Sequence, residues 1–120
     1  MRAAAIVLAL AMTVSAALAQ TAADAPGAVL RGLDKQSGQT TDLTVKNGES
    51  AAFGPLTVSV SACRYPADNA AADAYAHVTI SDAGQTRLFD GWMIATSPAL
   101  SAMDHPRYDV WVVRCISTDG

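Results

Sequence analysis

Leu56-Thr57-Val58-Ser59-Val60-Ser61-Ala62 is the stretch of sequence that decides the fold. Its apolar residues occupy every second position and Thr or Ser the positions between, which is the pattern of a β-strand with one buried and one solvated face. Cys63 follows on the solvated parity. Either a β-bulge resets the alternation at that point or Cys63 lies at the rim of the sheet. We expect the rim.

Strand-like segments recur on both sides of this stretch, separated by turn residues. The pair Asn47-Gly48 is the strongest hairpin signal, because both residues tolerate a positive φ. No segment has sustained helical periodicity, although a single helical turn is expected around residues 99–103. On residues 75–81 the alternation turns His77 toward solvent. The other expected strands are 28–33, 40–46, 86–95 with a bend at Gly91, and 108–115, which is apolar on both faces and therefore expected at the centre of a sheet.

These patterns predict an all-β fold: one small single-domain sandwich or partly closed barrel of about seven strands with one disulfide. The first residues have the features of a secretory signal peptide, with Arg2 at the start, a short apolar run, and a small-x-small cleavage site at Ala17-Leu18-Ala19. We expect 1–19 to be removed on export and no membrane span to remain. The expected divisions after it are a flexible N-terminal arm over 20–27, the β domain over 28–116 and a C-terminal tail over 117–120.

Cys63 and Cys115 are the two cysteines of the chain. Export would place them in an oxidising compartment, where an even count favours a disulfide. A metal-ligand pair or two reactive thiols are less favoured, because there is no C-x-x-C spacing and the two residues stand far apart. The formal net charge is −3, and loss of Arg2 with the signal makes the exported chain one unit more negative. An acidic domain without a basic stripe is a poor binder of nucleic acid.

Several motifs together resemble the domain of unknown function 2155, a family of small exported proteins of alphaproteobacteria. They are Leu33-Asp34-Lys35 with Gly38, Phe53-Gly54 before Leu56, Cys63-Arg64 with Pro66, Gly91-Trp92-Met93, Ser97-Pro98, His105-Pro106, and Tyr108-Asp109-Val110-Trp111 through Cys115. The resemblance covers residues 29–115, with Asp104 as a departure where the family is expected to carry the longer Glu. It implies a periplasmic protein of one domain with paired cysteines. It implies no activity, because the family is uncharacterised.

The segment 91–115 holds both tryptophans and the densest mixture of apolar anchors with polar side chains. Loops on a rigid scaffold often carry function, and Trp, Tyr and Arg are enriched in protein-interface hot spots. We expect a protein-binding surface here, with Arg64 and Tyr65 beside it if the cysteines pair. In the competing, structural interpretation, polar side chains around His105 pin a loop over one end of the domain. The candidate surface residues are Trp92, Met93, Ser97, Met103, Asp104, His105, Arg107, Tyr108, Asp109 and Trp111.

No complete catalytic or cofactor signature is present, so no catalytic residue, metal site or cofactor is assigned and the protein is not expected to be an enzyme. Ser97 lies near His105 in sequence, but without a strained serine elbow or a Gly-rich oxyanion loop. Met93 and Met103 are possible copper ligands with His105, and Met is also common core filler. The expected function is a non-enzymatic accessory or protein-binding module of the cell envelope, periplasmic, with a protein partner. The alternatives are a small inhibitor or stabiliser of a periplasmic enzyme, and a hydrolase or copper-binding protein that uses His105.

Overall fold

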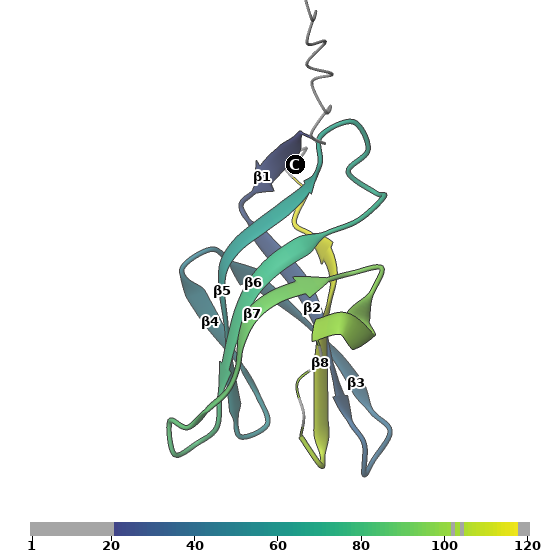
Figure 1. Ribbon diagram of the computed structural model, residues 1–120. Coiled ribbons are helices and arrows are strands. Elements are labelled where there is room, and N and C mark those ends of the chain that lie inside the picture. Colours follow the sequence, from purple (N-terminus) through teal and green to yellow (C-terminus); the bar gives the residue numbers. More distant parts are fainter. Residues whose placement is uncertain (1–20, 102, 104, 118–120) are drawn as a thin grey trace, which may run out of the picture.

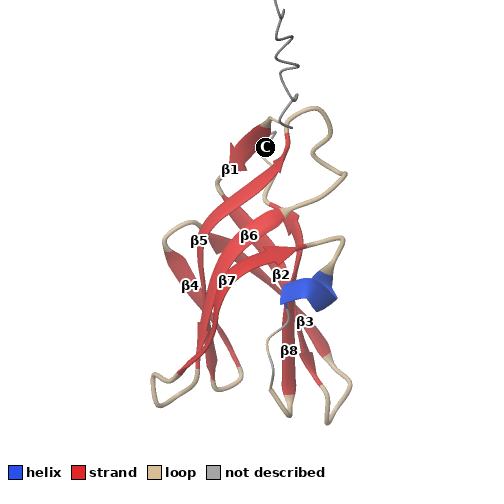
Figure 2. Cartoon of the chain, viewed as in Figure 1, coloured by secondary structure: helices blue, strands red, loops and turns tan. Residues whose placement is uncertain are grey.

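A computed structural model describes residues 21–101, 103 and 105–117. The expected signal peptide over 1–19, the candidate residue Asp104 and residues 118–120 of the expected tail lie outside the described residues. The described part is all-β, as predicted, with eight strands and one 3-10 turn (Figure 1 and Figure 2). No helix in it is long and apolar enough to span a bilayer. The elements are β1 (Ala22–Ala25), β2 (Gly27–Asp34), β3 (Thr40–Lys46), β4 (Glu49–Phe53), β5 (Leu56–Pro66), β6 (Tyr75–Ser81), β7 (Arg87–Ile94), η1 (Pro98–Ser101) and β8 (Tyr108–Cys115).

The strands form two antiparallel sheets. The larger sheet has the order β1-β5-β6-β7, with β4 also paired to β5, and the smaller has the order β3-β2-β8. The 11 residues of β5 give it room to pair with β4 along its first half and β1 along its last. Figure 1 shows the larger sheet curving over the smaller one. Among the described residues no ladder joins β7 to β8 or β3 to β4, so the two sheets do not close into a barrel.

The core lies between the two sheets and is built from the inward positions of the alternating strands. Leu56, Val58 and Val60 of β5 are at most 1% exposed, and they pack with Ile80 of β6 and Leu30 of β2 in one cluster. Full burial of an aliphatic side chain of this size contributes about 1.5–3 kcal/mol. The period of two in 56–62 therefore fixes which face of β5 forms the core.

A β-bulge in β5 corrects the expected place of Cys63. The register of β5 against β6 shifts between Val60 and Ala62, which leaves Ser61 as the extra residue of the bulge. Because the bulge resets the alternation, Cys63 turns inward and is 1% exposed rather than lying at the rim. The bulge was the weaker of the two alternatives from sequence, and it is the one that the structure adopts.

The Asn47-Gly48 pair forms a turn but not the expected hairpin. Gly48 has a φ of 83°, as the sequence predicts, yet β3 pairs with β2 and β4 pairs with β5. The turn therefore carries the chain from the smaller sheet to the larger one. It is held by the Asn47 backbone N–H, which donates to the Pro26 carbonyl, and by the Asn47 amide Nδ2, which donates to the Ala25 carbonyl, at 2.8 and 2.9 Å.

Two further expectations are wrong. The arm over 20–27 is not loose at Ala22–Ala25, because these residues form β1 and pair with Cys63–Pro66 of β5. β8 is an edge strand rather than a central one, since its one partner in the described part of the chain is β2. In β7 a register irregularity lies opposite the Ile80/Ser81 step. The helical turn is found at Pro98–Ser101, slightly before the predicted 99–103.

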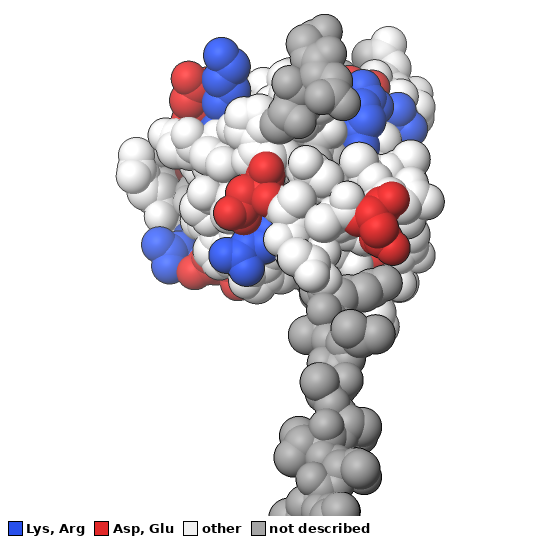
Figure 3. All heavy atoms as spheres, turned by 90° about the horizontal axis from the view of Figure 1, so that it is seen from above, with Lys and Arg blue, Asp and Glu red and all other residues white. Residues whose placement is uncertain are grey.

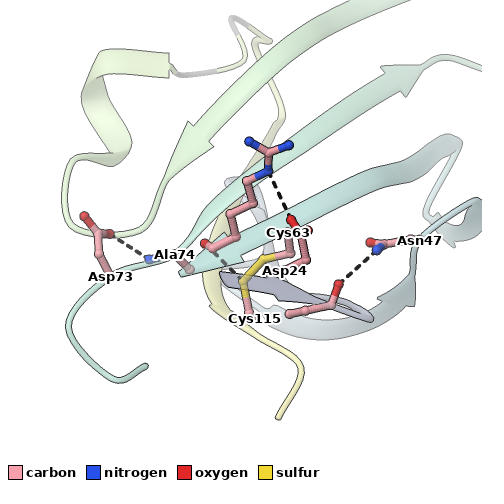
Figure 4. The surroundings of a disulfide bond; sticks show 8 residues. Asp24, Asn47, Cys63, Asp73, Ala74 and Cys115 are labelled. Carbon is pink, nitrogen blue, oxygen red and sulfur yellow. Dashed lines mark hydrogen bonds and ion pairs between the residues drawn. A yellow bond between two sulfur atoms is a disulfide. The ribbon is translucent and has the colours of Figure 1, made fainter. Parts of the chain in front are cut away.

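The predicted disulfide joins Cys63 to Cys115, with Cα atoms 5.7 Å apart (Figure 4). Cys63 lies on β5 of the larger sheet and Cys115 at the end of β8 in the smaller sheet, so the bond ties the two sheets together. The two cysteines are 52 positions apart in sequence. A loop of about 50 residues closed by a disulfide stabilises the folded state by about 4 kcal/mol in the chain-entropy model.

Candidate functional site

The structure separates the predicted binding surface into three regions. Met93, Met103 and Tyr108 are part of the core, with exposed fractions of 2%, 3% and 8%. The second region is the end of the domain around His105, Arg107 and Asp109, with Ser97 and Trp111 near the η1 turn. The third is the outward face of the larger sheet, where Trp92 is 43% exposed. A partner can contact only the second and third regions directly.

Burial of three predicted surface residues follows from strand parity. Met93 alternates with Trp92 on β7 and therefore faces the core. Tyr108 begins β8 on the inward parity, and its ring meets the ring of Phe53 edge to face, with centroids 5.4 Å apart. Met fills irregular core space well because its side chain is long and flexible. The idea that Met93 and Met103 ligate copper is not supported by this placement.

The geometry around His105 agrees with the competing, structural interpretation, in which polar side chains pin a loop over one end of the domain. His105 Nδ1 accepts hydrogen bonds from the backbone N–H groups of Arg107 and Tyr108, both at 3.1 Å. Lys35 donates from Nζ to the His105 carbonyl at 2.9 Å. These bonds tie the start of β8 to the end of β2. Because Nδ1 accepts two backbone bonds, it is not the nitrogen that would take a proton from Ser97.

An ion pair between Arg107 and Asp34 closes this end of the domain. Arg107 Nη2 lies 3.1 Å from Asp34 Oδ2, and Nε lies 3.3 Å from Oδ1, so the pair is bidentate. The hydrogen bond from Arg107 lowers the pKa of the Asp34 carboxyl below its usual value, against a smaller opposing effect of desolvation. The same bond raises the pKa of the Arg107 guanidinium. Arg107 is thus engaged within the fold, and Lys35 lies 4.0 Å from Asp109 Oδ2 beside it.

Ser97 and Trp111 lie close to the η1 turn. The Ser97 backbone N–H donates to the Ile94 carbonyl, and the Ser97 carbonyl accepts from the Leu100 N–H, both at 3.1 Å. Ser97 therefore starts the turn, as a Ser-Pro pair predicts. Trp111 points outward from β8 and lines a surface pocket of about 270 Å³ with Pro98, Ala99 and Asp109. Among the described residues no group of three or more His, Cys, Asp or Glu is placed to hold a metal ion.

Trp92 lies on the outward face of the larger sheet among side chains from three other strands. We call this face the Trp92 surface. Trp92 is directly opposite His77 in the β6–β7 ladder, and their rings meet edge to face with centroids 5.3 Å apart. Arg64 on β5 reaches over the indole, with Cζ 5.8 Å from the ring centroid, which is within cation–π range. The surface consists of Asp24, Ser61, Arg64, His77, Asp90 and Trp92.

His77 lies between the hydroxyl of Ser61, which is within hydrogen-bond distance, and the carboxylate of Asp90 on the other side. Its Nδ1 lies 2.7 Å from Ser61 Oγ, and its Nε2 lies 3.6 Å from Asp90 Oδ1. Asp90 also accepts from Thr79 Oγ1 and pairs with Arg87, both at 3.2 Å. Ser, His and Asp are the residue types of a nucleophilic triad, but the serine contacts Nδ1 and the carboxylate lies by Nε2, the reverse of the usual order. What the arrangement does is fix the imidazole beside Trp92.

Arg64 is fixed in the same way by β1. Its Nε lies 3.2 Å from Asp24 Oδ1, and the two residues are direct partners in the β1–β5 ladder (Figure 4). Tyr65, the other residue expected beside the site, lies elsewhere and lines a pocket with Cys115 and Arg114. Arg64 therefore lies near Trp92 because β5, β6 and β7 are neighbours in the same sheet. The disulfide, which the sequence had suggested as the link, does not bring the two residues together.

Four members of the Trp92 surface were not predicted as site residues: Asp24, Ser61, His77 and Asp90. The alternation of β6 does turn His77 outward, which was predicted, and the parity of β7 puts Asp90 on the same face as Trp92. The strand register that places His77 opposite Trp92 cannot be read from the sequence. Ser61 contacts His77 because it lies in the bulge of β5. Asp24 lies on β1, in the segment that was predicted to be a flexible arm.

Charges of both signs are interspersed on the described part of the molecule. Figure 3 shows Lys and Arg next to Asp and Glu on the face seen from above, without one large single-sign patch. The ion pairs Arg31–Asp42, Arg64–Asp24 and Arg107–Asp34 account for much of this arrangement.

Comparison with known proteins gives a family and no activity. The chain is 31% identical over 87 residues to the uncharacterized protein RP359 of Rickettsia prowazekii (strain Madrid E), and the match covers 69% of this chain and 56% of the relative. It thus spans about half the length of that curated relative. No solved structure matches the chain significantly. The model of the family described as "Uncharacterized protein conserved in bacteria (DUF2155)" matches residues 28–115, which include the disulfide and all of the Trp92 surface except Asp24, and the chain therefore belongs to this family.

Proposed function

We propose that this protein is a non-enzymatic binding module of the bacterial cell envelope, which works in the periplasm and holds a protein partner on the Trp92 surface. The observation that carries the proposal is the exposed indole of Trp92, 43% accessible on the polar outward face of the larger sheet. Tryptophan and arginine are the side chains most enriched in interface hot spots. Here they lie together, with Arg64 against the Trp92 ring.

The Trp92 surface is organised before any partner arrives, which favours binding. His77, Arg64 and Asp90 each have a hydrogen-bonding or ionic neighbour within the protein. Side chains that are already ordered lose less conformational entropy on association than free ones. The strands beneath them form a rigid support, tied to the smaller sheet by the Cys63–Cys115 bond.

The periplasmic location is part of the proposal and has two supports. The sequence begins with the pattern of a secretory signal over residues 1–19. The cysteines Cys63 and Cys115 are bonded, and such bonds persist in oxidising compartments such as the bacterial periplasm. Neither support depends on the Trp92 surface, so the location and the binding role can be tested separately.

A second candidate function is the inhibitor or stabiliser of a periplasmic enzyme, which would act through the η1 turn. One observation favours it: Leu100 is 77% exposed on that turn, more than any other large apolar side chain of the described residues. An exposed leucine on a short turn suits insertion into a cleft of a target. The turn lies beyond the end of β7 and is separate from the Trp92 surface (Figure 1).

Capture of partners from oxidised periplasmic extract tests both candidates. The immobilised wild type is compared with Trp92→Ala, Leu100→Ala and, as a control on the exposed β2–β3 turn, Gln36→Ala. A partner that is kept by Leu100→Ala and Gln36→Ala and lost by folded Trp92→Ala supports the binding surface. If Leu100→Ala is the one variant that loses the partner, the η1 turn is the binding site. Equal capture by all four proteins, or by none, contradicts the Trp92 surface as the binding site.

A further inference from the structure

β7 is the last strand of the larger sheet, and among the described residues it pairs with β6 only. The Ala95 N–H donates to the Ala74 carbonyl at 2.9 Å, so Ala74 and Ala95 belong to a hydrogen-bonded position of the antiparallel ladder. Such positions alternate with non-hydrogen-bonded ones. Counting along the register, Trp92 opposite His77 and Asp90 opposite Thr79 fall on the non-hydrogen-bonded positions. The backbone N–H and C=O groups of Trp92 and Asp90 therefore point away from β6, to the free edge.

This edge is less protected between Asp90 and Trp92 than at its start, where the charged Arg87 and a register irregularity lie. Natural edge strands are blunted by lysine, proline or high charge. The outer strand β3 follows that rule, because it presents Asp42 and Lys46 among exposed threonines. β7 has neither proline nor lysine, and it presents the exposed indole of Trp92 beside the edge.

We propose that β7 is a docking edge, along which an extended segment of the partner protein adds as a further strand of the larger sheet. This inference rests on the proposed binding function of the Trp92 surface and names the form of the partner. Only another extended backbone offers donors and acceptors at the spacing of Asp90 and Trp92, since a helix satisfies its own backbone groups internally. The free stretch is short: the Ile94 carbonyl already accepts from the Ser97 N–H, so the added strand ends before Ile94.

The outward side chains of β7 define the chemistry of the added segment. Side chains on one face of neighbouring strands meet directly, so the partner presents one residue to Trp92 and another, two positions away, to Asp90. An apolar or aromatic side chain matches the indole. A basic one matches Asp90 and the net charge of −3 of the chain. The segment that the edge selects therefore alternates a basic and an apolar residue on one face.

The test uses a display library of random ten-residue linear peptides, selected on the purified protein. Two substitutions at Asp90 distinguish the contribution of its backbone N–H to peptide binding from that of its side chain. Asp90→Ala removes the carboxylate and keeps the outward N–H, whereas Asp90→Pro also removes the N–H, which a strand with that N–H facing out tolerates. We expect Asp90→Pro to weaken selected peptides about tenfold or more and Asp90→Ala about threefold or less. Bound peptides should slow amide exchange at Asp90 and Trp92, a readout on the wild type that remains decisive if Asp90→Pro does not fold.

The outcomes that overturn the inference differ from those that overturn the proposed function. If Trp92→Ala abolishes partner capture but peptides bind Asp90→Pro as well as the wild type, the Trp92 surface binds and the edge does not. Failure to select any peptide, or protection of amides elsewhere, also overturns the edge. Sedimentation of the protein alone adds one more outcome, since a dimer that Asp90→Pro dissociates would make a second copy of this chain the occupant instead.

Discussion

The imidazole of His77 meets the indole of Trp92 edge to face, with ring centroids 5.3 Å apart and an interplanar angle of 71°. The two residues stand opposite each other on β6 and β7, at a position where side chains of an antiparallel pair approach closely. An edge-to-face contact of this kind contributes about 0.5–1.5 kcal/mol. Its effect here is to hold a partly exposed indole in one orientation on an open sheet face.

Truncation of two adjacent residues of β7 should lower the free energy of unfolding by different amounts, because one side chain faces the core and the other faces solvent. Met93 is 2% exposed, so Met93→Ala leaves a cavity in the core and should cost about 2–5 kcal/mol of the free energy of unfolding. Trp92 is 43% exposed on the other face, so Trp92→Ala should cost no more than about 1.5 kcal/mol while partner capture is lost. Urea unfolding followed by circular dichroism measures both. A larger loss for Trp92→Ala than for Met93→Ala would contradict the assignment of the two faces.

The disulfide should account for a large share of the stability. Cys63→Ala/Cys115→Ala is expected to lower the free energy of unfolding by about 2–5 kcal/mol, because the open chain has more conformational freedom when unfolded. A domain of this size has about 5–15 kcal/mol in total. Denaturant titrations with and without dithiothreitol provide the control: the reductant should lower the stability of the wild type and leave the double variant unchanged. An equal response of the two proteins to the reductant would show that the bond is not intact in solution.

The Arg107–Asp34 pair should make stability depend on pH in the acid range. The pKa of Asp34 is lowered in the folded state by the hydrogen bond from Arg107. Its contribution is therefore complete above the unfolded value near 3.8 and is lost as the pH falls through the lower folded pKa. In Arg107→Ala the pKa of Asp34, followed by NMR, should rise toward 3.8.

Comparison of unfolding curves at two pH values checks the same pair through stability. The difference between the wild type and Arg107→Ala should be present at about pH 6 and should shrink as the pH falls below the unfolded value near 3.8 and through the lower folded pKa. Asp42 also has a lowered pKa through Arg31, but that pair is common to both proteins and cancels. A difference that stays constant with pH would assign the role of Arg107 to packing.

Local patterns predicted the strands better than the sheets. The alternation of Leu56, Val58 and Val60 gave the buried face of β5, and a glycine at 48 gave a turn with positive φ. Neither pattern states which strands pair. The Asn47-Gly48 turn links two different sheets because β3 and β4 each have a better partner elsewhere, and pairing of distant strands is a tertiary property.

The candidate surface was predicted in part for the same reason. Trp92 and Met93 were both predicted as surface residues, but Trp92 is exposed and Met93, on the opposite parity of β7, faces the core. Arg64 and His77 lie near Trp92 only because β5, β6 and β7 are neighbours in a particular register. That register includes a bulge at Ser61, which no local signal in the sequence requires.

A glycine on β2 offers a test of the packing between the sheets. A Cβ built on Gly32 would lie 2.5 Å from Cζ of Phe53, the residue that ends β4 in the other sheet. Phe53 is 8% exposed and packed against Tyr108, so its ring has little room to withdraw. Gly32→Ala is therefore expected to lower the free energy of unfolding by about 1–3 kcal/mol through overpacking.

The double variant Gly32→Ala/Phe53→Leu identifies the cause, because the smaller Leu vacates the space that the new methyl group needs. Phe53→Leu alone removes ring contacts and should destabilise, while the two changes together should cost less than the sum of the single costs, by at least about 0.5 kcal/mol. Denaturant unfolding of the four proteins gives this coupling energy. Additive costs would mean that Gly32 is required for its backbone conformation and not for the approach of Phe53.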